Sequence, residues 1–398
     1  MLSIEYSRII NFCKEFGGDK IRPILEIKRF PVYNELLFEK DIENVMLAMD
    51  QIVKEFLSNK SIDDFCDQFG IIPEVRAFIQ NPCASKSSML RVDFMVDTHG
   101  QPKICELNVD SSIGGAEIAG ISRMKYSQAS ESTICAKEPY DLLADYFKEI
   151  IQKNDVNQIC IFDFSKWIEY GAFSSVYLKN ILFEKIPGVK ILCVDENNYE
   201  NVIDSRTLVY RQFLLEDSLD NLDLLHKIYS KTSHVVTDFS GEIWGNKKWL
   251  EMIWRYHQAH FFNKEVSDSI QRTMMPTYVV NSDNLELLIR NQRKYVFKKI
   301  DSYGGQDILV GKECRQDELL NVLEKAIEDK KQWIAQEYIH SYPICIHAEQ
   351  GNRCREFLAN YVLGKYRINH KWSGDLVRAS AISSIVNVQN GSYIGWSS

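Results

Sequence analysis

Four polar side chains, Arg91, Asp93, Glu106 and Asn108, have the types and spacing that metal and phosphate chemistry requires. The segments around them alternate apolar and polar residues and are joined by DTHGQP, whose Gly and Pro indicate a turn. Side chains alternate along a strand, so each pair shares one face of its own segment. We therefore predict a β-hairpin over residues 89–109 with one polar face and one apolar face.

This polar face predicts a magnesium site. Asp93, Glu106 and Asn108 offer only oxygen ligands, the set that Mg²⁺ prefers, whereas transition metals favour His or Cys. Arg91 on the same face can hold a phosphoryl group through its planar donors. The alternative is an exposed hairpin with a solvated salt bridge. The metal site is the better interpretation because surface strands rarely favour an Asn beside an acid.

A loop of small residues, NVDSSIGG, follows the hairpin directly. Its serines and glycines, among them Ser111, Ser112 and Gly114, would let a ligand approach backbone N–H groups. Such clusters are mostly plain turns, and only the position beside the acids favours a binding role.

A second candidate region is YVFKKIDSYGG, where two adjacent lysines end an apolar strand before a double glycine. Backbone amides of Gly304 and Gly305 can cradle phosphate oxygens, and a strand lysine adds a charge to them. An ordinary hairpin with a Gly-Gly turn is the alternative. Strand parity favours Lys298 over Lys299 as the phosphate ligand. The GxxxxGK[ST] pattern of a Walker A loop is absent.

The elements that position these residues predict a mixed α+β and α/β protein. Helical spacing over residues 42–56 makes the first ninety residues mainly helical, and residues 159–213 form a strand, helix, strand, strand layer. At 398 residues the chain exceeds one ordinary core. We predict four regions, which are a helical segment (1–88), the metal hairpin with part of the core (89–150), a small α/β substrate subdomain (151–240) and a lysine and glycine-loop lobe with closing strands (241–398).

The composition excludes several classes of protein. Charged residues make up 26% and the net charge is −8 without a block of like charge, so a nucleic-acid or anionic-membrane surface is not expected. The ten cysteines form no CxxC pair, which argues against a zinc knuckle and a disulfide framework and favours the cytoplasm. No targeting segment and no apolar run of membrane-spanning length is present. The oligomeric state is left open.

Taken together and in this order, the motifs resemble the ATP-grasp superfamily, in its circularly permuted form, similar to the synthetase domain of glutathionylspermidine synthase. The resemblance spans roughly residues 89 to 380 and rests on RVDF, CELN with NVDSSIGG, FNK, VFKK, SYGG and IAQEYI. It implies a fold in which ATP is bound between two α+β lobes. The amidase half of the bifunctional enzymes is missing, so the substrates need not be glutathione or spermidine.

The resemblance also implies roles for individual residues. Arg91 would be the catalytic residue, and Ser111, Ser112 and Arg211 would touch the substrates. ATP would be held by the lysines, the glycine turn and the strand end at residues 336–339. The full set is Asp93, Glu106 and Asn108 for Mg²⁺, and Lys264, Lys298, Gly304, Gly305, Gln336, Glu337 and Ile339 for ATP.

The predicted activity is a carboxylate–amine ligase that activates a small-molecule or peptide carboxylate as an acyl phosphate, joins it to an amine and releases ADP and phosphate. An ATP-grasp phosphotransferase and a non-catalytic nucleotide-binding scaffold are the alternatives. A cysteine or serine hydrolase is disfavoured because no GxSxG appears, His99 lies in a turn, and His257 and His260 lie on a Trp-rich helix. The sequence leaves the acid and the amine unidentified.

Overall fold

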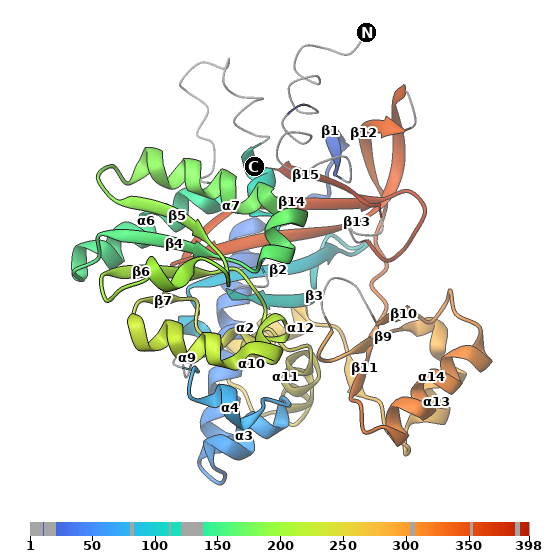
Figure 1. Cartoon of the computed structure of the whole chain (residues 1–398). Coiled ribbons are helices and arrows are strands. Elements are labelled where there is room, and N and C mark those ends of the chain that lie inside the picture. Colours follow the sequence, from blue (N-terminus) through green and yellow to red (C-terminus); the bar gives the residue numbers. More distant parts are fainter. Residues whose placement is uncertain are drawn as a thin grey trace.

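Three β-sheets organise the part of the chain that the computed structural model describes, which is residues 11, 21–79, 83–110, 113–120, 138–302, 307–350, 353–386 and 391–397. The largest sheet has seven strands in the order β12-β1-β15-β14-β13-β2-β3. Figure 1 shows it across the middle of the molecule. Its strands are β1 (Arg22–Arg29), β2 (Met89–Val96), β3 (Pro102–Val109), β12 (Ile344–Gln350), β13 (Arg353–Ile368), β14 (Lys371–Ser380) and β15 (Tyr393–Ser397).

Strand β13 organises this sheet because it has two sets of neighbours. Residues 353–359 pair with β12, whereas residues 360–368 pair with β14. The pairing of β12 with β13 closes five of the strands into a ring, since β12 also pairs with β1. The second half of β13 also pairs with β2, so the β2–β3 hairpin extends from the side of the ring.

Helices pack beneath this sheet and form the main core with it (Figure 1). The Asn34 side chain accepts a hydrogen bond from Leu37 N and so caps the longest of them, α2. Apolar residues at helical spacing on α2 are fully buried, for example Ile42, Val45 and Met49. The helices here are α2 (Glu35–Leu57), α3 (Ile62–Gln68), α4 (Pro73–Arg76), α10 (Gly241–Trp244), α11 (Lys248–Gln258) and α12 (Lys264–Thr273).

A parallel sheet in the order β5-β4-β6-β7 forms the second unit. Its central strands β4 and β6 are buried at every residue, as expected for a sheet covered by helices on both faces. Its strands are β4 (Gln158–Phe162), β5 (Lys190–Val194), β6 (Thr207–Arg211) and β7 (Val235–Val236). Its helices are α6 (Pro139–Lys153), α7 (Ser165–Lys185), α8 (Leu215–Ser218) and α9 (Leu222–Lys231).

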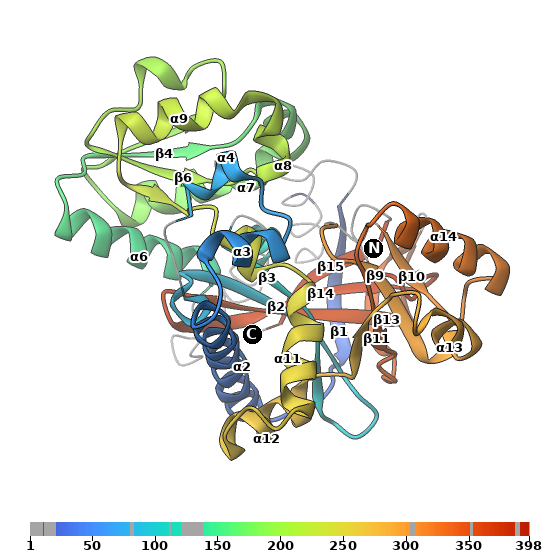
Figure 2. The same ribbon diagram turned by 90° about the horizontal axis from the view of Figure 1, so that it is seen from below.

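The third unit is a small lobe with a hydrophobic core of its own, visible in orange in Figures 1 and 2. Its sheet has the order β10-β9-β11-β8. Its elements are β8 (Thr277–Val279), α13 (Leu285–Arg290), β9 (Tyr295–Lys299), β10 (Ile308–Val310), α14 (Gln316–Glu328) and β11 (Trp333–Glu337). Short 3₁₀ turns complete the chain, namely η2 (Ala84–Lys86), η4 (Ala116–Ala119), η5 (Tyr199–Asn201), η6 (Leu219–Asn221) and η7 (Gln292–Lys294).

The described part of the first ninety residues contains α2, α3 and α4 and also a strand that the sequence analysis did not predict. This strand is β1, which pairs in parallel with β15 and in antiparallel with β12. Its sequence, RPILEIKR, places charges between its apolar residues without strict alternation, so the pattern gave no strand signal.

Two further observations bear on the compositional predictions. Among the described residues no helix is both long and apolar enough to span a lipid bilayer. The eight cysteines in the described ranges are all free thiols.

Candidate functional site

The β2–β3 hairpin brings its four polar side chains together on one face. Arg91 pairs with Asn108 across the two strands, and Asp93 pairs with Glu106. The register then shifts and skips Cys105, because the next pair is Phe94 with Ile104. Bulges of this kind bend a strand and leave backbone groups unpaired, and they are frequent beside active sites.

Asp93 is the centre of a buried ion-pair cluster. Arg91 donates to both of its carboxylate oxygens, with Nε 2.8 Å and Nη2 3.1 Å away. Arg378 from β14 lies 2.7 Å from Asp93 Oδ2, and Asn108 Nδ2 donates to the same oxygen at 3.0 Å. Burial works to raise the pKa of Asp93, but the two arginines outweigh it and hold the pKa below its usual range. The carboxylate is therefore an anion that holds two cations in place.

Gly364 on β13 has no side chain, and the Asp93 cluster occupies the space that a side chain would fill. Gly364 pairs with Asp93 in the sheet, and a Cβ built on it would lie 2.9 Å from Arg91 Cδ and 3.1 Å from Asp93 Oδ1. Since both ends of the Arg91 side chain are held, it cannot move aside cheaply. A glycine is thus required here by close approach of side chains from the neighbouring strand.

We expect Gly364→Ala to lower the free energy of unfolding by about 1–3 kcal/mol, the usual cost of overpacking a buried site. Denaturant unfolding followed by tryptophan fluorescence measures this change. Gly114→Ala is the matched control, because a Cβ at Gly114 would meet nothing within 4 Å. Equal unfolding midpoints for the two variants would contradict the packing argument.

Lys247 connects Glu106 to the small lobe. Its Nζ lies 2.8 Å from Glu106 Oε1 and also donates to the carbonyl oxygen of Ser302, while its backbone N–H donates to Ile300 O at 3.3 Å. Its side chain is only 3% exposed. The sequence interpretation missed Lys247, although the pair Asn246-Lys247 repeats the Asn-Lys pair that drew attention to Lys264.

Lys298 reaches the same hairpin strand from the lobe. Its Nζ donates to the Cys105 carbonyl oxygen at 2.9 Å and to Gln336 Oε1 at 2.7 Å, and Gln336 Nε2 donates to Ile104 O at 3.1 Å. The bulge at Cys105 provides the first of these acceptors. Burial lowers the pKa of Lys298, whereas the neighbouring Cys105 and Glu106 raise it.

Strand pairing explains why these two side chains meet. Lys298 pairs with Ile334 in the β9–β11 register, so Gln336 is its diagonal neighbour on the same face. Lys299 takes the other direction, since its Nζ lies 3.1 Å from Asp301 Oδ1. The two adjacent lysines therefore point in different directions, and Lys298 is the one that faces the hairpin.

The remaining predicted nucleotide ligands lie at the end of β11 or on another side of the molecule. Glu337 N donates to Pro276 O at 2.8 Å, and burial raises the pKa of the Glu337 carboxyl. Ile339 is buried. Lys264 is exposed at the start of α12, beside the Glu265–Lys40 ion pair of 2.8 Å, which joins α12 to α2 rather than to the lobe (Figure 2).

Arg211 points into the protein. It is 1% exposed, its Nε donates to Thr237 O at 3.0 Å, and its guanidinium carbon lies 4.1 Å from the centre of the Phe239 ring. Its neighbours in sequence, Tyr210 on β6 and Gln212 directly after β6, line a cavity instead. The predicted residues Ser111, Ser112, Gly304 and Gly305 lie outside the described residues.

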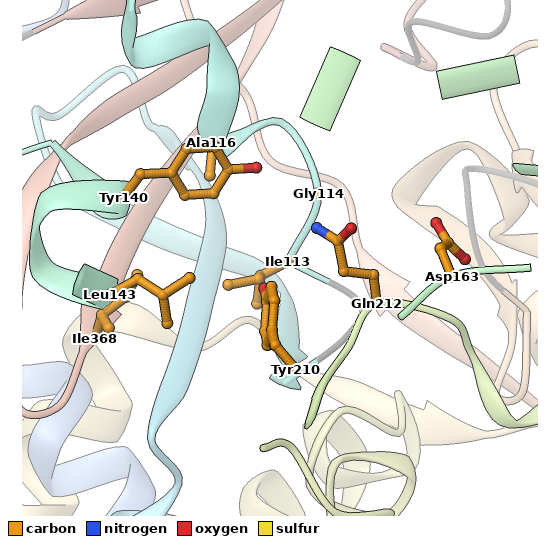
Figure 3. A pocket seen from close by; sticks show the side chains of 9 residues that line it. All are labelled: Ile113, Gly114, Ala116, Tyr140, Leu143, Asp163, Tyr210, Gln212 and Ile368. Atoms are coloured by element: carbon orange, nitrogen blue, oxygen red, sulfur yellow. The ribbon is translucent and has the colours of Figure 1, made fainter. Parts of the chain in front are cut away.

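This cavity lies between the parallel sheet and the loop that follows β3, and Figure 3 shows it from close by. Its volume is about 180 Å³. Gly114, one of its lining residues, accepts hydrogen bonds from Arg91 Nη1 and from Tyr366 Oη. Gly114 therefore connects the lining of the cavity to the ion-pair cluster of the hairpin. It is lined by Ile113, Gly114, Ala116, Tyr140, Leu143, Asp163, Tyr210, Gln212 and Ile368.

The three sheets and this arrangement define a mixed α/β protein with the glutathione synthetase-like fold. A glutathione synthetase-like effector from Globodera pallida, solved without ligand, matches with a TM-score of 0.62 and 15% identity over 98% of this chain and 92% of its own. A protein named as a gamma-glutamylcysteine synthetase from Methylobacillus flagellatus KT matches at 0.44 and 9% identity over 88% and 87% of the two chains, which is too low to bear on the fold. No protein-family model and no curated protein matches the sequence.

Proposed function

We propose that this protein is an ATP- and Mg²⁺-dependent carboxylate–amine ligase with an ATP-grasp arrangement. The observation that carries the proposal is the convergence of Lys247 and Lys298, from two separate elements, on the adjacent residues Cys105 and Glu106 of one strand. A structural protein rarely buries two lysines against one hairpin, because each buried ammonium group costs desolvation free energy.

The positive charge at the hairpin favours a polyphosphate as the ligand of this site. Arg91, Arg378, Lys247 and Lys298 lie at the hairpin, and the ion pairs there are with the carboxylates of Asp93 and Glu106. A third carboxyl group, that of Glu117, lies near Arg91, and burial raises its pKa. The four cations and the two paired carboxylates together leave a surplus of two positive charges. Such a surplus attracts phosphate groups. A triphosphate accepting from Lys247 and Lys298 would replace the carbonyl oxygens that these lysines now contact.

The nucleotide base would lie at the end of β11, where Gln336, Glu337 and Ile339 follow one another. Gly304 and Gly305 remain our candidates for covering the phosphates, since they follow Lys298 in the chain between β9 and β10. Lys264 is replaced in this proposal by Lys247, which contacts both the hairpin and the lobe.

The residues present fit a magnesium ion that is held mainly by phosphates. No group of three His, Cys, Asp or Glu side chains in the described ranges is arranged to hold a metal. Mg²⁺ commonly takes only one or two protein oxygens and keeps phosphate and water ligands for the rest. Glu106 and the Asn108 amide oxygen would supply those two, while Asp93 would orient Asn108 through their 3.0 Å hydrogen bond. When bound, the ion would neutralise charge on the phosphates.

The chain's own residues would then position the acyl group and stabilise its charge. Arg91 projects between Asp93 and Gly114, so its guanidinium can bind the substrate carboxylate as it becomes an acyl phosphate. Attack by an amine on that acyl phosphate gives an amide and inorganic phosphate. The lobe above the hairpin would exclude water, which would otherwise hydrolyse the activated acid.

The direct test is phosphate release from ATP and Mg²⁺ in the presence of amino acids, short peptides and amines, with mass spectrometry of the products. We expect ADP, phosphate and a new amide for at least one acid and amine pair. A stable phosphorylated product would instead support a phosphotransferase. Binding of ATP without turnover of any pair would leave the nucleotide-binding scaffold, and failure to bind ATP at all would refute the ligase.

We expect Lys247→Ala to weaken ATP binding by about tenfold to 100-fold, the range expected for loss of a charged phosphate contact. Lys264→Ala is the matched control and should leave ATP affinity within about twofold, since isolated surface charges contribute little. Calorimetric titration of ATP and Mg²⁺ into each variant measures both. The reverse order of effects would restore Lys264 as the phosphate ligand.

A further inference from the structure

The cavity occupies the position where open parallel sheets usually bind ligands. From β4 the chain passes through α7 to β5 on one side, whereas β6 pairs with β4 on the other side. The strand order thus reverses at β4, and the carboxyl ends of β4 and β6 flank the crevice that results. Asp163 follows β4 and Gln212 follows β6, and both line the cavity (Figure 3).

The lining has an apolar end and a polar end. Leu143 and Ile368 lie together at one end in Figure 3, Ile113 lies in the middle beside Tyr210, and Gln212 and Asp163 lie at the other end. The nine lining residues include one carboxyl group and no lysine or arginine. Two arginines are adjacent in sequence to lining residues, and both are held elsewhere, because Arg211 is turned toward Phe239 and Arg367 pairs with Glu43. Among the described residues, therefore, no cationic side chain lines the cavity to neutralise a carboxylate.

Asp163 itself lacks a cationic partner among the described side chains. Its Oδ1 accepts from Phe164 N at 2.9 Å, and the nearby Lys166 is paired with Asp217 at 2.8 Å. The pKa of Asp163 is raised to about 7, chiefly by burial and also by Asp217 and Glu196, against the lowering effect of the Phe164 N–H and Lys166. A buried carboxylate in this state gains most from a cation supplied by a ligand.

We propose that this cavity binds a ligand with an apolar body and a protonated primary amine, with Asp163 as the counter-ion and Gln212 beside it. The inference rests on the proposed function, since the occupant would be one of the substrates to be joined. The amine held by Asp163 stays protonated and does not react. The other end of the molecule lies toward Gly114 and Arg91, where the new bond would form.

The test compares three probes that share a body and differ in their end, which are pentylammonium, pentan-1-ol and pentanoate. Each is titrated calorimetrically into the full chain without nucleotide at pH 8. We expect pentylammonium to bind about tenfold more tightly than the other two, as a charge-assisted hydrogen bond implies. Equal or tighter binding of pentanoate, or no binding of pentylammonium, would overturn the proposal.

Asp163→Asn should remove the preference for pentylammonium, and Asp223→Asn should keep it. Asp223 is exposed on α9, so its replacement removes the same charge from the same unit away from the cavity. The wild-type preference should also increase as pH rises through about 7, because Asp163 then ionises. Glu196, Asp217, Lys166, Tyr140 and Tyr210 are the other titratable groups that face this end.

Stability provides an independent check that Asp163→Asn folds. The folded pKa of Asp163 lies above its unfolded value, so the folded state binds more protons and the wild type loses stability as pH rises toward about 7. We therefore expect the variant to melt above the wild type at pH 8 and close to it below pH 4. If the variant does not fold, the three-probe comparison on the wild type still decides the proposal.

Failure of this inference and failure of the proposed function give different results. Tight pentylammonium binding that depends on Asp163, without any ATP turnover, would sustain the cavity assignment and refute the ligase. ATP-dependent amide formation by an enzyme that prefers pentanoate in this cavity would sustain the ligase and refute the cavity assignment.

Discussion

Lys298→Met is expected to lower ATP-dependent phosphate release by about 100-fold or more, the usual effect of removing one preorganised charge donor. Methionine keeps the length and apolar stem of lysine but removes its ammonium group. Lys298 is buried between β9 and β3 and its Nζ donates to Cys105 O, so this ammonium group faces the hairpin. Steady-state phosphate release at saturating ATP measures the loss.

Lys299→Met is the matched control for this variant. Lys299 is adjacent in sequence, yet its Nζ contacts Asp301 and its side chain is 25% exposed. We expect its phosphate release to stay within about threefold of the wild type, since an exposed ion pair contributes little. A larger loss in Lys299→Met than in Lys298→Met would place the nucleotide on the other face of β9 and refute the site.

Asp93→Asn is expected to destabilise the protein by about 3–5 kcal/mol, because it leaves Arg91 and Arg378 buried without their shared anion. Urea unfolding at pH 7 measures this change. The folded pKa of Asp93 is below its unfolded value, so its contribution is complete above about pH 4 and is lost as pH falls further. The difference from the wild type should accordingly shrink in acid.

Glu106→Gln should affect turnover more than stability. Its carboxylate is 21% exposed but pairs with the buried Lys247, so we expect a loss of about 1–3 kcal/mol, smaller than that of Asp93→Asn. Metal-dependent turnover should fall by about 100-fold, because an amide replaces the anionic ligand. If Asp93→Asn instead unfolds like the wild type and loses only turnover, Asp93 is the metal ligand and its ion pairs are secondary.

The polar face of the hairpin followed from the sequence because strand parity is a local property. Arg91, Asp93, Glu106 and Asn108 needed only the period of two and a recognisable turn. The same reasoning selected Lys298 over Lys299, and the structure places Lys298 against β3. Both inferences used information within about twenty residues of the side chains concerned.

Other parts of the site depend on contacts between distant segments, and the sequence did not indicate them. Arg378 reaches Asp93 only because β13 lies between β14 and β2. Lys247 and Lys264 both follow an asparagine, and only the packing of α12 on α2 separates their positions. Arg211 was named from the family resemblance, whereas the residue beside it, Gln212, lines the cavity.

The way the small lobe is attached constrains how the molecule can open. The chain enters the lobe beside Pro276 and leaves it at Glu337, and these two crossings are hydrogen-bonded to each other at 2.8 Å. Because the two connections are adjacent, they would act as a single hinge, about which the small lobe can rotate relative to the hairpin. The hydrogen bonds of Lys247, Lys298 and Gln336 join the hairpin to the lobe and hold the two together. A ligand that binds these lysines would therefore break the contacts between the lobe and the hairpin and release the lobe.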